Sequence, residues 1–417
     1  MIEKTKNHLK KYNRIIKIKY FFTFLVLVFV TSSCSLSNIK GQELTPKVPE
    51  IISKKEVVVK LKPKEKVRPK PKEITLLALG DIMLSRGIGR AMVRRDNDYP
   101  FKFMDGYLKK GDIVFANLES MLGESKDKAG RNKKPYFKKP YNFLATPEAS
   151  KVLKKAGLTI LSLANNHAMD FGPSPIAETR RLLSKEGIGF FGAGKNLREA
   201  REAASVNLGD TNFSFIGYTI AHPDVFATKE KPGAASIYER YVIDDVRTLR
   251  KKTDVLIVSL HWGKEYKEQP TKWQRGLARK IIDAGADIII GHHPHVLQGV
   301  EFYKNKPIAY SLGNFIFDQK SGRTTGGAIF EYKFKGSELY SFGIIPISRV
   351  NTYYPKVSSG KARNDTLKEL IEISTPLNKD KTYLDALKSF SVLLDDKEKK
   401  KNLEKNKNKK IKQDILN

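Results

Sequence analysis

Short apolar runs recur along the middle of the chain, and amphipathic segments separate several of them. The runs are too short for helices and therefore favour buried strands. They are Ile74–Leu79, Ile113–Ala116, Thr159–Leu163, Val255–Leu260 and Ala286–Ile290. Helical patterns occupy Pro147–Ala156, Pro175–Glu186, Asp244–Lys252 and Thr271–Ala284, with glycines at three of the expected helix ends. Strand-like patterns rich in Phe and Tyr follow at Ile308–Ser311, Ala328–Phe334 and Leu339–Ile347. The order predicts an α/β sandwich of mixed sheets flanked by helices.

The two ends of the chain differ in composition from its middle. The net charge is +32 over 417 residues, and residues 74–350 contain 43 Lys and Arg against 29 Asp and Glu, so this stretch carries +14. The other +18 lies in the ends, as solvated tails or as contacts to an anionic surface. No nucleic-acid motif accompanies the charge, so we expect no nucleic-acid partner.

The first 34 residues have the pattern of an export signal. A basic start precedes the eleven-residue apolar run Tyr20–Val30, and small residues lead to Cys34, the only cysteine. The run is shorter than the roughly 20 residues of a membrane-spanning helix. It resembles a lipoprotein signal, in which Cys34 would carry the lipid, although Thr31 stands where such signals usually have Leu. An uncleaved anchor and simple secretion are the alternatives, and all three place the domain outside the cytoplasm.

Four further segments follow the predicted signal at residues 1–34. Residues 35–73 form a spacer in which Leu61–Lys72 alternates Lys and Pro, a composition that favours an extended linker. Residues 74–350 hold the predicted domain, and residues 351–396 form a C-terminal extension with weak patterning. Residues 397–417 are rich in Lys and Asn and indicate a solvated tail.

Polar residues follow the predicted strands, where open α/β sheets gather their ligands. The densest group is Gly291-His292-His293-Pro294-His295, directly after Ile288–Ile290. The others are Asp81, Asn117, Glu119, Asn165, Asn166, His167, His261 and Asn314. Each alone has a bland interpretation, such as a turn residue, a helix cap or a packed polar side chain. Together they indicate one shared metal site, because neutral imidazoles and carboxylates are the usual ligands of transition metals. His222, before Pro223, is interpreted as structural.

Successive motifs resemble those of the CapA, or poly-γ-glutamate capsule synthesis, family. They are Gly80-Asp81-Ile82-Met83, Ala116-Asn117-Leu118-Glu119, Ala164 to Gly172, His261-Trp262-Gly263-Lys264-Glu265, Gly291 to Val296 and Ser311 to Phe315. The resemblance covers residues 74–330 and keeps the order of the family's motifs. That family in turn is similar to the calcineurin-like metallophosphoesterases, which implies a β-sandwich flanked by helices and a site for one or two divalent metals.

The resemblance assigns roles to individual residues. Asp81, Glu119, Asn166, His261, His293 and His295 would bind metal, and His167 would act on the leaving group or the transition-state charge. Asn117, Asn165, Asp170, Glu265, His292 and Asn314 would support them. Met83 stands where the phosphoesterase motif has a histidine, and Asn117 where it has a bridging aspartate. We therefore expect one firmly held manganese, iron or zinc ion and a second that is weaker or dependent on substrate. Met83 is expected to pack beneath the site.

Two functions remain open at this level. The first is a metal-dependent hydrolase or transferase, anchored outside the cytoplasm, that acts in the synthesis, export or anchoring of an anionic polymer such as poly-γ-glutamate. The second is a non-catalytic component that binds polymer or assembles a synthase complex. The basic segment Lys126–Lys139 and the arginines Arg86, Arg90, Arg94 and Arg95 could guide a polyanion, or could be an ordinary solvated surface.

Overall fold

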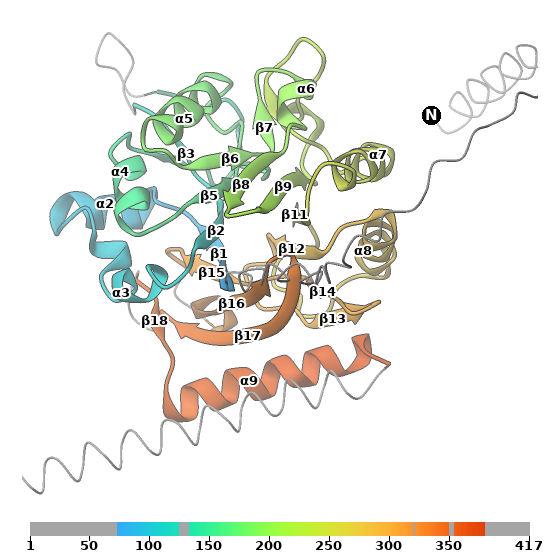
Figure 1. Cartoon of the computed structure of the whole chain (residues 1–417). Helices are drawn as coiled ribbons and strands as arrows, with labels where there is room; N and C mark the ends of the chain where they lie inside the picture. The colour runs from blue at the N-terminus through green and yellow to red at the C-terminus, as the bar shows by residue number, and fades with distance from the viewer. Residues whose placement is uncertain (1–72, 125–132, 320–321, 350–353, 380–417) are drawn as a thin grey trace, which may run out of the picture. The chain divides into compact units, whose positions relative to one another are not determined.

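The computed structural model describes residues 73–124, 133–319, 322–349 and 354–379, all within the unit Arg68–Asn417 (Figure 1). Two larger sheets pack face to face, and helices cover their outer faces. The predicted signal with Cys34, the Lys/Pro linker and the Lys-rich tail lie outside the described residues. No helix of the described residues is long and apolar enough to cross a membrane.

The first sheet is mixed and has the strand order β18-β17-β16-β1-β2-β5-β6, with β15 pairing to β1. Its centre is parallel, from β1 through β2 and β5 to β6, while β16 and β17 add antiparallel strands. The strands are β1 (Glu73–Ile82), β2 (Ile113–Leu118), β5 (Ile160–Ser162), β6 (Gly189–Phe191), β15 (Asn314–Ile316), β16 (Gly326–Lys335), β17 (Glu338–Ser348) and β18 (Lys356–Val357).

The second sheet has the order β13-β14-β12-β11-β9-β8, and its central strands β9, β11, β12 and β14 run parallel. Its strands are β8 (Ala204–Leu208), β9 (Thr211–Thr219), β11 (Val255–His261), β12 (Ile288–His292), β13 (Val300–Tyr303) and β14 (Lys306–Ala309). Two small pairs lie outside these sheets: β3 (Met121–Leu122) with β4 (Leu144–Ala145), and β7 (Ala193–Gly194) with β10 (Gly233–Ala234).

Three apolar cores correspond to the layers of the sandwich. The side chains alternate along each strand, so that Leu76 and Ala78 of β1 enter the core between the sheets, whereas Leu77 and Leu79 enter the core under the helices. The helices over the first sheet are α2 (Arg86–Arg94), α3 (Asp105–Leu108), α4 (Ala149–Lys155) and α5 (Ser174–Lys185). The second sheet is covered by α7 (Glu239–Arg250) and α8 (Lys272–Ala284), and α6 (Leu197–Ala200) lies beside β7. Four short 3₁₀ turns complete the described chain: Tyr99–Phe101, Pro223–Val225, Gly322–Thr325 and Thr375–Leu377.

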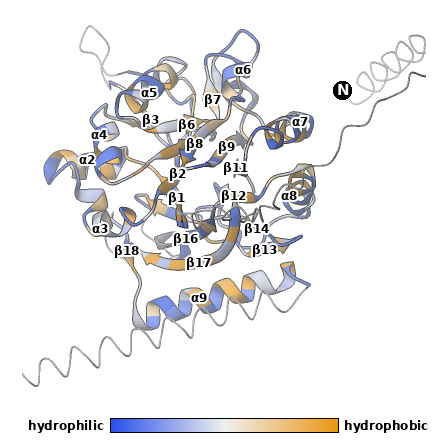
Figure 2. Cartoon of the chain, in the orientation of Figure 1, coloured by the Kyte–Doolittle hydropathy of each residue, from blue (hydrophilic) through white to orange (hydrophobic). Residues whose placement is uncertain are grey.

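Helix α9 (Gly360–Ser374) lies in the C-terminal extension, a region whose sequence pattern is weak. It runs beside β17, and Figure 2 shows hydrophilic and hydrophobic residues alternating along it. Leu367, Leu370 and Ile373 join the core between the sheets. Gln269 donates to the carbonyl of Ile373, and Ser374 accepts from the amide of Val300, so polar contacts also hold α9 in place.

The predicted fold class is confirmed, since mixed sheets are flanked by helices as expected. All five predicted apolar runs form strands, and all four helical patterns form helices, with ends that differ by a few residues. The glycines expected to stop helices, at positions 157, 187 and 285, all have positive φ, a conformation that suits glycine at a helix end. Strand β9 and helix α2 were not expected: β9 alternates with polar residues, and α2 is rich in arginine and glycine.

A glycine in β12 sets how closely two strands can approach. A Cβ added to Gly291 would lie 1.9 Å from the carbonyl oxygen of Tyr310, which the backbone cannot accommodate without moving. We predict that Gly291→Ala lowers the free energy of unfolding by about 2–4 kcal/mol. The control is Gly276→Ala in the exposed part of α8, where a Cβ meets nothing within 4 Å. It should raise stability by about 0.5–1 kcal/mol in the same denaturant titration. Equal stability of the two variants would contradict the close packing at Gly291.

Candidate metal centre

A bulge in β1 turns the side chain of Asp81 toward the space between the two sheets. Ala78 pairs with Phe115, and Asp81 pairs with Asn117, so β1 advances three residues while β2 advances two. The extra residue reverses the alternation, and Ile82 rather than Asp81 joins the helix-side core. Gly80 permits this, because a Cβ there would lie 2.0 Å from the carbonyl oxygen of Gly313.

Asp81 and Asn117 thus meet a histidine from the other sheet. His261 ends β11 on the side of Val255 and Ile257, which belong to the core between the sheets. Asp81, Glu119 and His261 are buried, and each offers a ligand atom within 4.8 Å of the others. The centre therefore lies at the carboxyl ends of strands from both sheets, as the sequence predicted for these three residues.

The amide of Asn117 stands among three acceptors. Its Nδ2 lies 2.8 Å from Oδ1 of Asp81, 3.1 Å from Oε2 of Glu119 and 3.3 Å from Nδ1 of His261. An amide group has two hydrogens to donate, so it cannot serve all three fully. Oε1 of Glu119 is buried and has no hydrogen-bond partner among the described residues. The excess of buried acceptors suits a cation.

His167 projects toward the same centre from the loop after β5. Its Nδ1 donates to Oδ2 of Asp170 at 2.7 Å, which leaves Nε2 directed toward Glu119, 3.9 Å from Oε1. Phe143 stacks on its ring with 3.9 Å between centroids. Lys139 forms an ion pair with the second oxygen of Asp170. Three neighbours thus fix one ring orientation and one tautomer of His167.

His295 is oriented by Asn314, as an outer-shell residue orients a metal ligand. Asn314 gives its Nδ2 hydrogens to Gln319 and Thr324, so its Oδ1 accepts from Nδ1 of His295 at 2.9 Å. The free Nε2 of His295 then lies 3.9 Å from Oε1 of Glu119. Sequence motifs placed His295 and Asn314 near the site, but only the packed structure shows this pairing.

The remaining predicted residues take different positions around the centre. Asn166 accepts from Nε2 of His261 at 2.8 Å, so its Oδ1 orients that ring. Asn165 links the loop to the carbonyl of Leu118 and to Asn117. His293 approaches through its backbone amide, 3.3 Å from Oδ2 of Asp81, and its buried Nδ1 has no partner among the described residues.

Two of the predicted supporting residues stand outside the cluster of ligand atoms. His292 is buried against Phe115 and lies 3.2 Å from the carbonyl of Leu79, which is a packing role. Glu265 is exposed, although it is near enough to raise the pKa of Glu119. Met83 packs in the helix-side core, where its sulfur accepts from the hydroxyl of Ser85, in agreement with the expected position beneath the site.

The pKa values of Asp81 and Glu119 are shifted in opposite directions. Burial, reinforced by the nearby Asp81, raises the pKa of Glu119 well above its usual range. Burial opposes ionisation of Asp81 too, but the hydrogen bond to His295 and the adjacent imidazoles outweigh it and hold the pKa of Asp81 below its usual range. Without metal, these shifts favour a proton on Glu119 and an ionised Asp81.

Burial favours the neutral form of the His261 and His293 imidazoles, and this is the form that binds metal. Burial lowers the pKa of His261 well below its usual value. Burial and the neighbouring His295 lower the pKa of His293 to about 4. Together with Asp81 and Glu119 these rings form the nitrogen and oxygen donor set that manganese, iron and zinc accept.

The sequence of the chain is similar to a known protein family and to several of its members. The model of the bacterial capsule synthesis protein PGA_cap matches residues 75–319. The chain belongs to this family. The capsule biosynthesis protein CapA of Bacillus anthracis is 33% identical over 305 residues, 72% of this chain and 73% of that protein. The PGA biosynthesis protein CapA of Bacillus subtilis is 32% identical over 307 residues, 73% and 78% of the two chains.

Among solved structures, the NAD nucleotidase of Haemophilus influenzae superposes with a TM-score of 0.38 and 12% identity, over 79% of this chain and 61% of that one. This similarity is distant. The family membership rests on the sequence match over residues 75–319.

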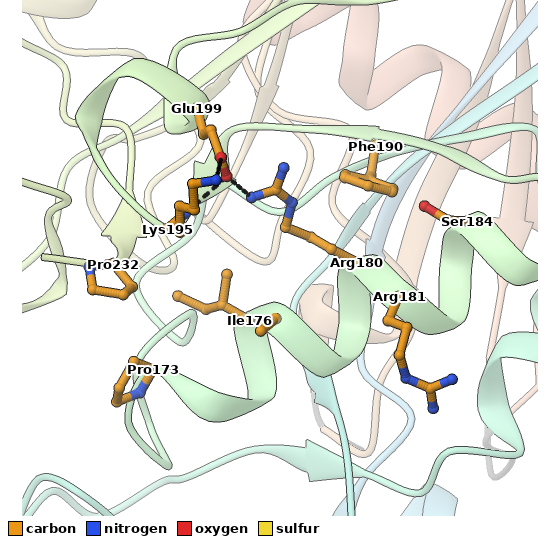
Figure 3. Close-up of a pocket in the computed structure, with 10 residues that line it drawn as sticks. Pro173, Ile176, Arg180, Arg181, Ser184, Phe190, Lys195, Glu199 and Pro232 are labelled. Atoms are coloured by element: carbon orange, nitrogen blue, oxygen red, sulfur yellow. Dashed lines mark hydrogen bonds and ion pairs between the residues drawn. The ribbon is translucent and has the colours of Figure 1, made fainter.

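A surface pocket of about 380 Å³ lies beside α5, away from the cluster (Figure 3). Arg180 and Lys195 both form ion pairs with Glu199, and Arg180 stacks over Phe190. The charged side chains that line this pocket are largely paired with one another, and none of the metal-centre residues lines it. The buried acceptors at Asp81 and Glu119 are therefore better evidence for chemistry than the size of this pocket.

Sequence reasoning missed several residues that shape the centre. Phe143, which stacks on His167, lies in no recognisable motif. Lys139 was assigned only to a basic loop, yet it pairs with Asp170. Arg349 is buried and donates to the carbonyls of Phe317 and Thr324, which braces the loop after Asn314. Its position at the end of β17 carried no signal in the sequence.

We predict that metal binding depends on His261. His261→Ala should weaken Mn²⁺ binding on the order of 100-fold or more, because one buried ligand is lost from the group with Asp81 and Glu119. The control is His222→Ala, an exposed histidine paired with Asp224. Isothermal titration of the full chain in detergent measures both affinities. Unchanged affinity for His261→Ala would exclude this centre as the metal site.

A second prediction concerns pH and Glu119. A carboxyl whose pKa is raised by folding stabilises the fold below its unfolded pKa and loses that stability as pH rises through the folded pKa. Metal-free Glu119→Gln should therefore exceed the wild type in unfolding free energy at pH 8 by about 1–3 kcal/mol, with little difference near pH 4. Mn²⁺ should stabilise the wild type more as pH rises and the variant hardly at all. Denaturant titrations with EDTA or Mn²⁺ measure this, and equal pH slopes would contradict the raised pKa.

Proposed function

We propose that the chain acts at the cell envelope, outside the cytoplasm, in the synthesis, export or anchoring of an anionic polymer of the poly-γ-glutamate type. Membership of the capsule synthesis family and two relatives named as capsule or PGA biosynthesis proteins support the process. The predicted export signal with Cys34 supports the location and a membrane anchor. The net charge of +32 suits a polyanionic partner.

We further propose metal-dependent hydrolysis or group transfer at the centre. The observation that carries this is the buried group of Asp81, Glu119 and His261, with Nε2 of His167 directed toward it. A divalent metal held by these residues and by His293 and His295 would supply a Lewis acid for a carbonyl or phosphoryl oxygen.

The chain's own residues then have separable tasks. Burial lowers the pKa of His167, although the carboxylate of Asp170 acts in the opposite direction. The ring is therefore neutral, and its Nε2 can take up or return a proton. Asp170 holds the proton on Nδ1, and Phe143 and Lys139 keep the ring in place. Asn166 and Asn314 orient His261 and His295.

The enzyme proposal is tested by turnover. With Mn²⁺, the full chain in detergent should cleave either a γ-linked glutamate polymer or a chromogenic phosphodiester, and His167→Ala should lower kcat by about 10²–10⁴-fold while Mn²⁺ binding persists. His222→Ala, exposed and remote from the cluster, should keep full activity. Activity that is equal in His167→Ala and the wild type would contradict the role of His167.

One observation favours the non-catalytic alternative. The Asn117 amide already stands among Asp81, Glu119 and His261, and Met83 packs in the core, so the centre has fewer strong ligands than a two-metal site. A chain that only assembles a synthase complex would bind polymer without turnover. In that case His167→Ala should still support polymer production in cells, whereas loss of production with folding, metal binding and polymer binding intact would exclude this alternative.

A further inference from the structure

Several residues around the metal centre have strained backbone conformations with positive φ. Six non-glycine residues of the described chain have positive φ. Lys304 and Asn305 form the turn between β13 and β14, where such angles are usual. The other four are Arg86, Tyr266, His293 and His295, with φ of 52°, 61°, 96° and 60°. Since two of these are candidate ligands, the strain points to Arg86 and Tyr266 as parts of the same site.

Arg86 presents a charged fork beside Phe143, the ring that stacks on His167. It begins α2, shortly after β1, and its side chain is 35% exposed. Its Nε lies 3.3 Å from Oδ2 of Asp318, and its guanidinium lies over the rings of Tyr141 and Phe143, 5.0 and 5.5 Å from their centroids. Phe143 in turn stacks on His167. No described residue accepts from the two terminal nitrogens of Arg86, so they are free for a ligand.

Two exposed tyrosines accompany Arg86. Tyr141 and Tyr266 are 59% and 53% exposed, and the guanidinium of Arg86 lies over the ring of Tyr141. Burial, with Glu265 and to a smaller extent Tyr141, raises the pKa of Tyr266. The Tyr266 ring lies 6.2 Å from that of His295, and its hydroxyl accepts from Gln319 at 3.1 Å. Gln319 also accepts from Asn314, which orients His295. Tyr266 is thus joined to the candidate ligands by a chain of hydrogen bonds.

We infer that Arg86, flanked by Tyr141 and Tyr266, forms a subsite for an anionic group of a molecule that binds over the metal centre. A guanidinium fork suits a carboxylate or a phosphate, which it binds through two parallel hydrogen bonds. The partial exposure of Arg86 and the two open tyrosine rings suit a chain that continues past the centre. This inference rests on the proposed function only for the identity of that chain as an anionic polymer.

Equilibrium binding tests the subsite without requiring turnover. The full chain in detergent, with and without Mn²⁺, is titrated with a hexamer of γ-linked glutamate and, separately, with inorganic phosphate. Arg86→Gln should weaken binding of the hexamer about 10- to 100-fold, and Tyr141→Ala about 2- to 5-fold. A loss for phosphate alone would assign the subsite to phosphate-bearing ligands, and a loss for the hexamer would assign it to carboxylates.

Two further variants separate the subsite from folding and from general charge. Arg86→Lys keeps the charge that faces Asp318 and Tyr141 but lacks the fork, and it should weaken binding about 3- to 10-fold while the melting temperature is kept. Arg240→Gln removes an exposed arginine from the first turn of α7, where it pairs with Asp244, and should change the affinity less than 2-fold.

The outcomes distinguish this inference from the proposed function. Binding that depends on Arg86 without any turnover would uphold the subsite and count against catalysis. Binding by Arg86→Gln and Arg86→Lys that matches the wild type, a loss of equal size in Arg240→Gln, or no binding of either anion by the wild type would overturn the subsite, whatever the enzyme assays show.

Discussion

The close approach of Gly80 to the carbonyl of Gly313 is the contact on which the centre depends. It accompanies the extra residue in β1 that brings Asp81 into register with Asn117, and the amide of Asp81 donates to the same carbonyl at 3.1 Å. Regular alternation would have buried Asp81 under the helices, where a carboxylate has no partner. With the bulge, a charged residue from the first sheet faces His261 from the second, and the apolar core between the sheets ends in a buried cluster of polar residues.

The polar residues at this edge form an arrangement with more acceptors than donors. Asn117 can serve only part of the demand from Asp81, Glu119 and His261, and Oε1 of Glu119 has no partner among the described residues. A proton on Glu119 or a bound cation can balance this excess. This excess adds to the effect of burial in raising the pKa of Glu119, and it also underlies the expected affinity for metal. The surrounding residues Asn166, Asn314 and Asp170 each fix one imidazole, which lowers the cost of ordering the rings when a ligand binds.

Much of the fold could be predicted because its strands are buried on both faces and therefore appear as continuous apolar runs. The runs at 74–79 and 255–260 both became strands of the sandwich. Strand β9 was not predicted, because polar residues such as Asn212 and Ser214 interrupt its run of apolar residues. No helix was predicted in the extension after residue 350, because α9 buries only a narrow stripe of apolar residues that includes Leu367 and Leu370.

The sequence by itself determined the kind of site, because carboxylates, amides and histidines follow successive strands in the order of the capsule synthesis family, which residues 75–319 match. It also indicated which positions depart from a two-metal site, namely Met83 and Asn117. Only the tertiary structure decided which of these groups face one another. The bulge at Gly80 directs Asp81 between the sheets, and Phe115 keeps His292 in the core. Phe143 stacks on His167, and Arg86 in turn lies over Phe143. Such contacts join residues far apart in the chain, so no local pattern records them.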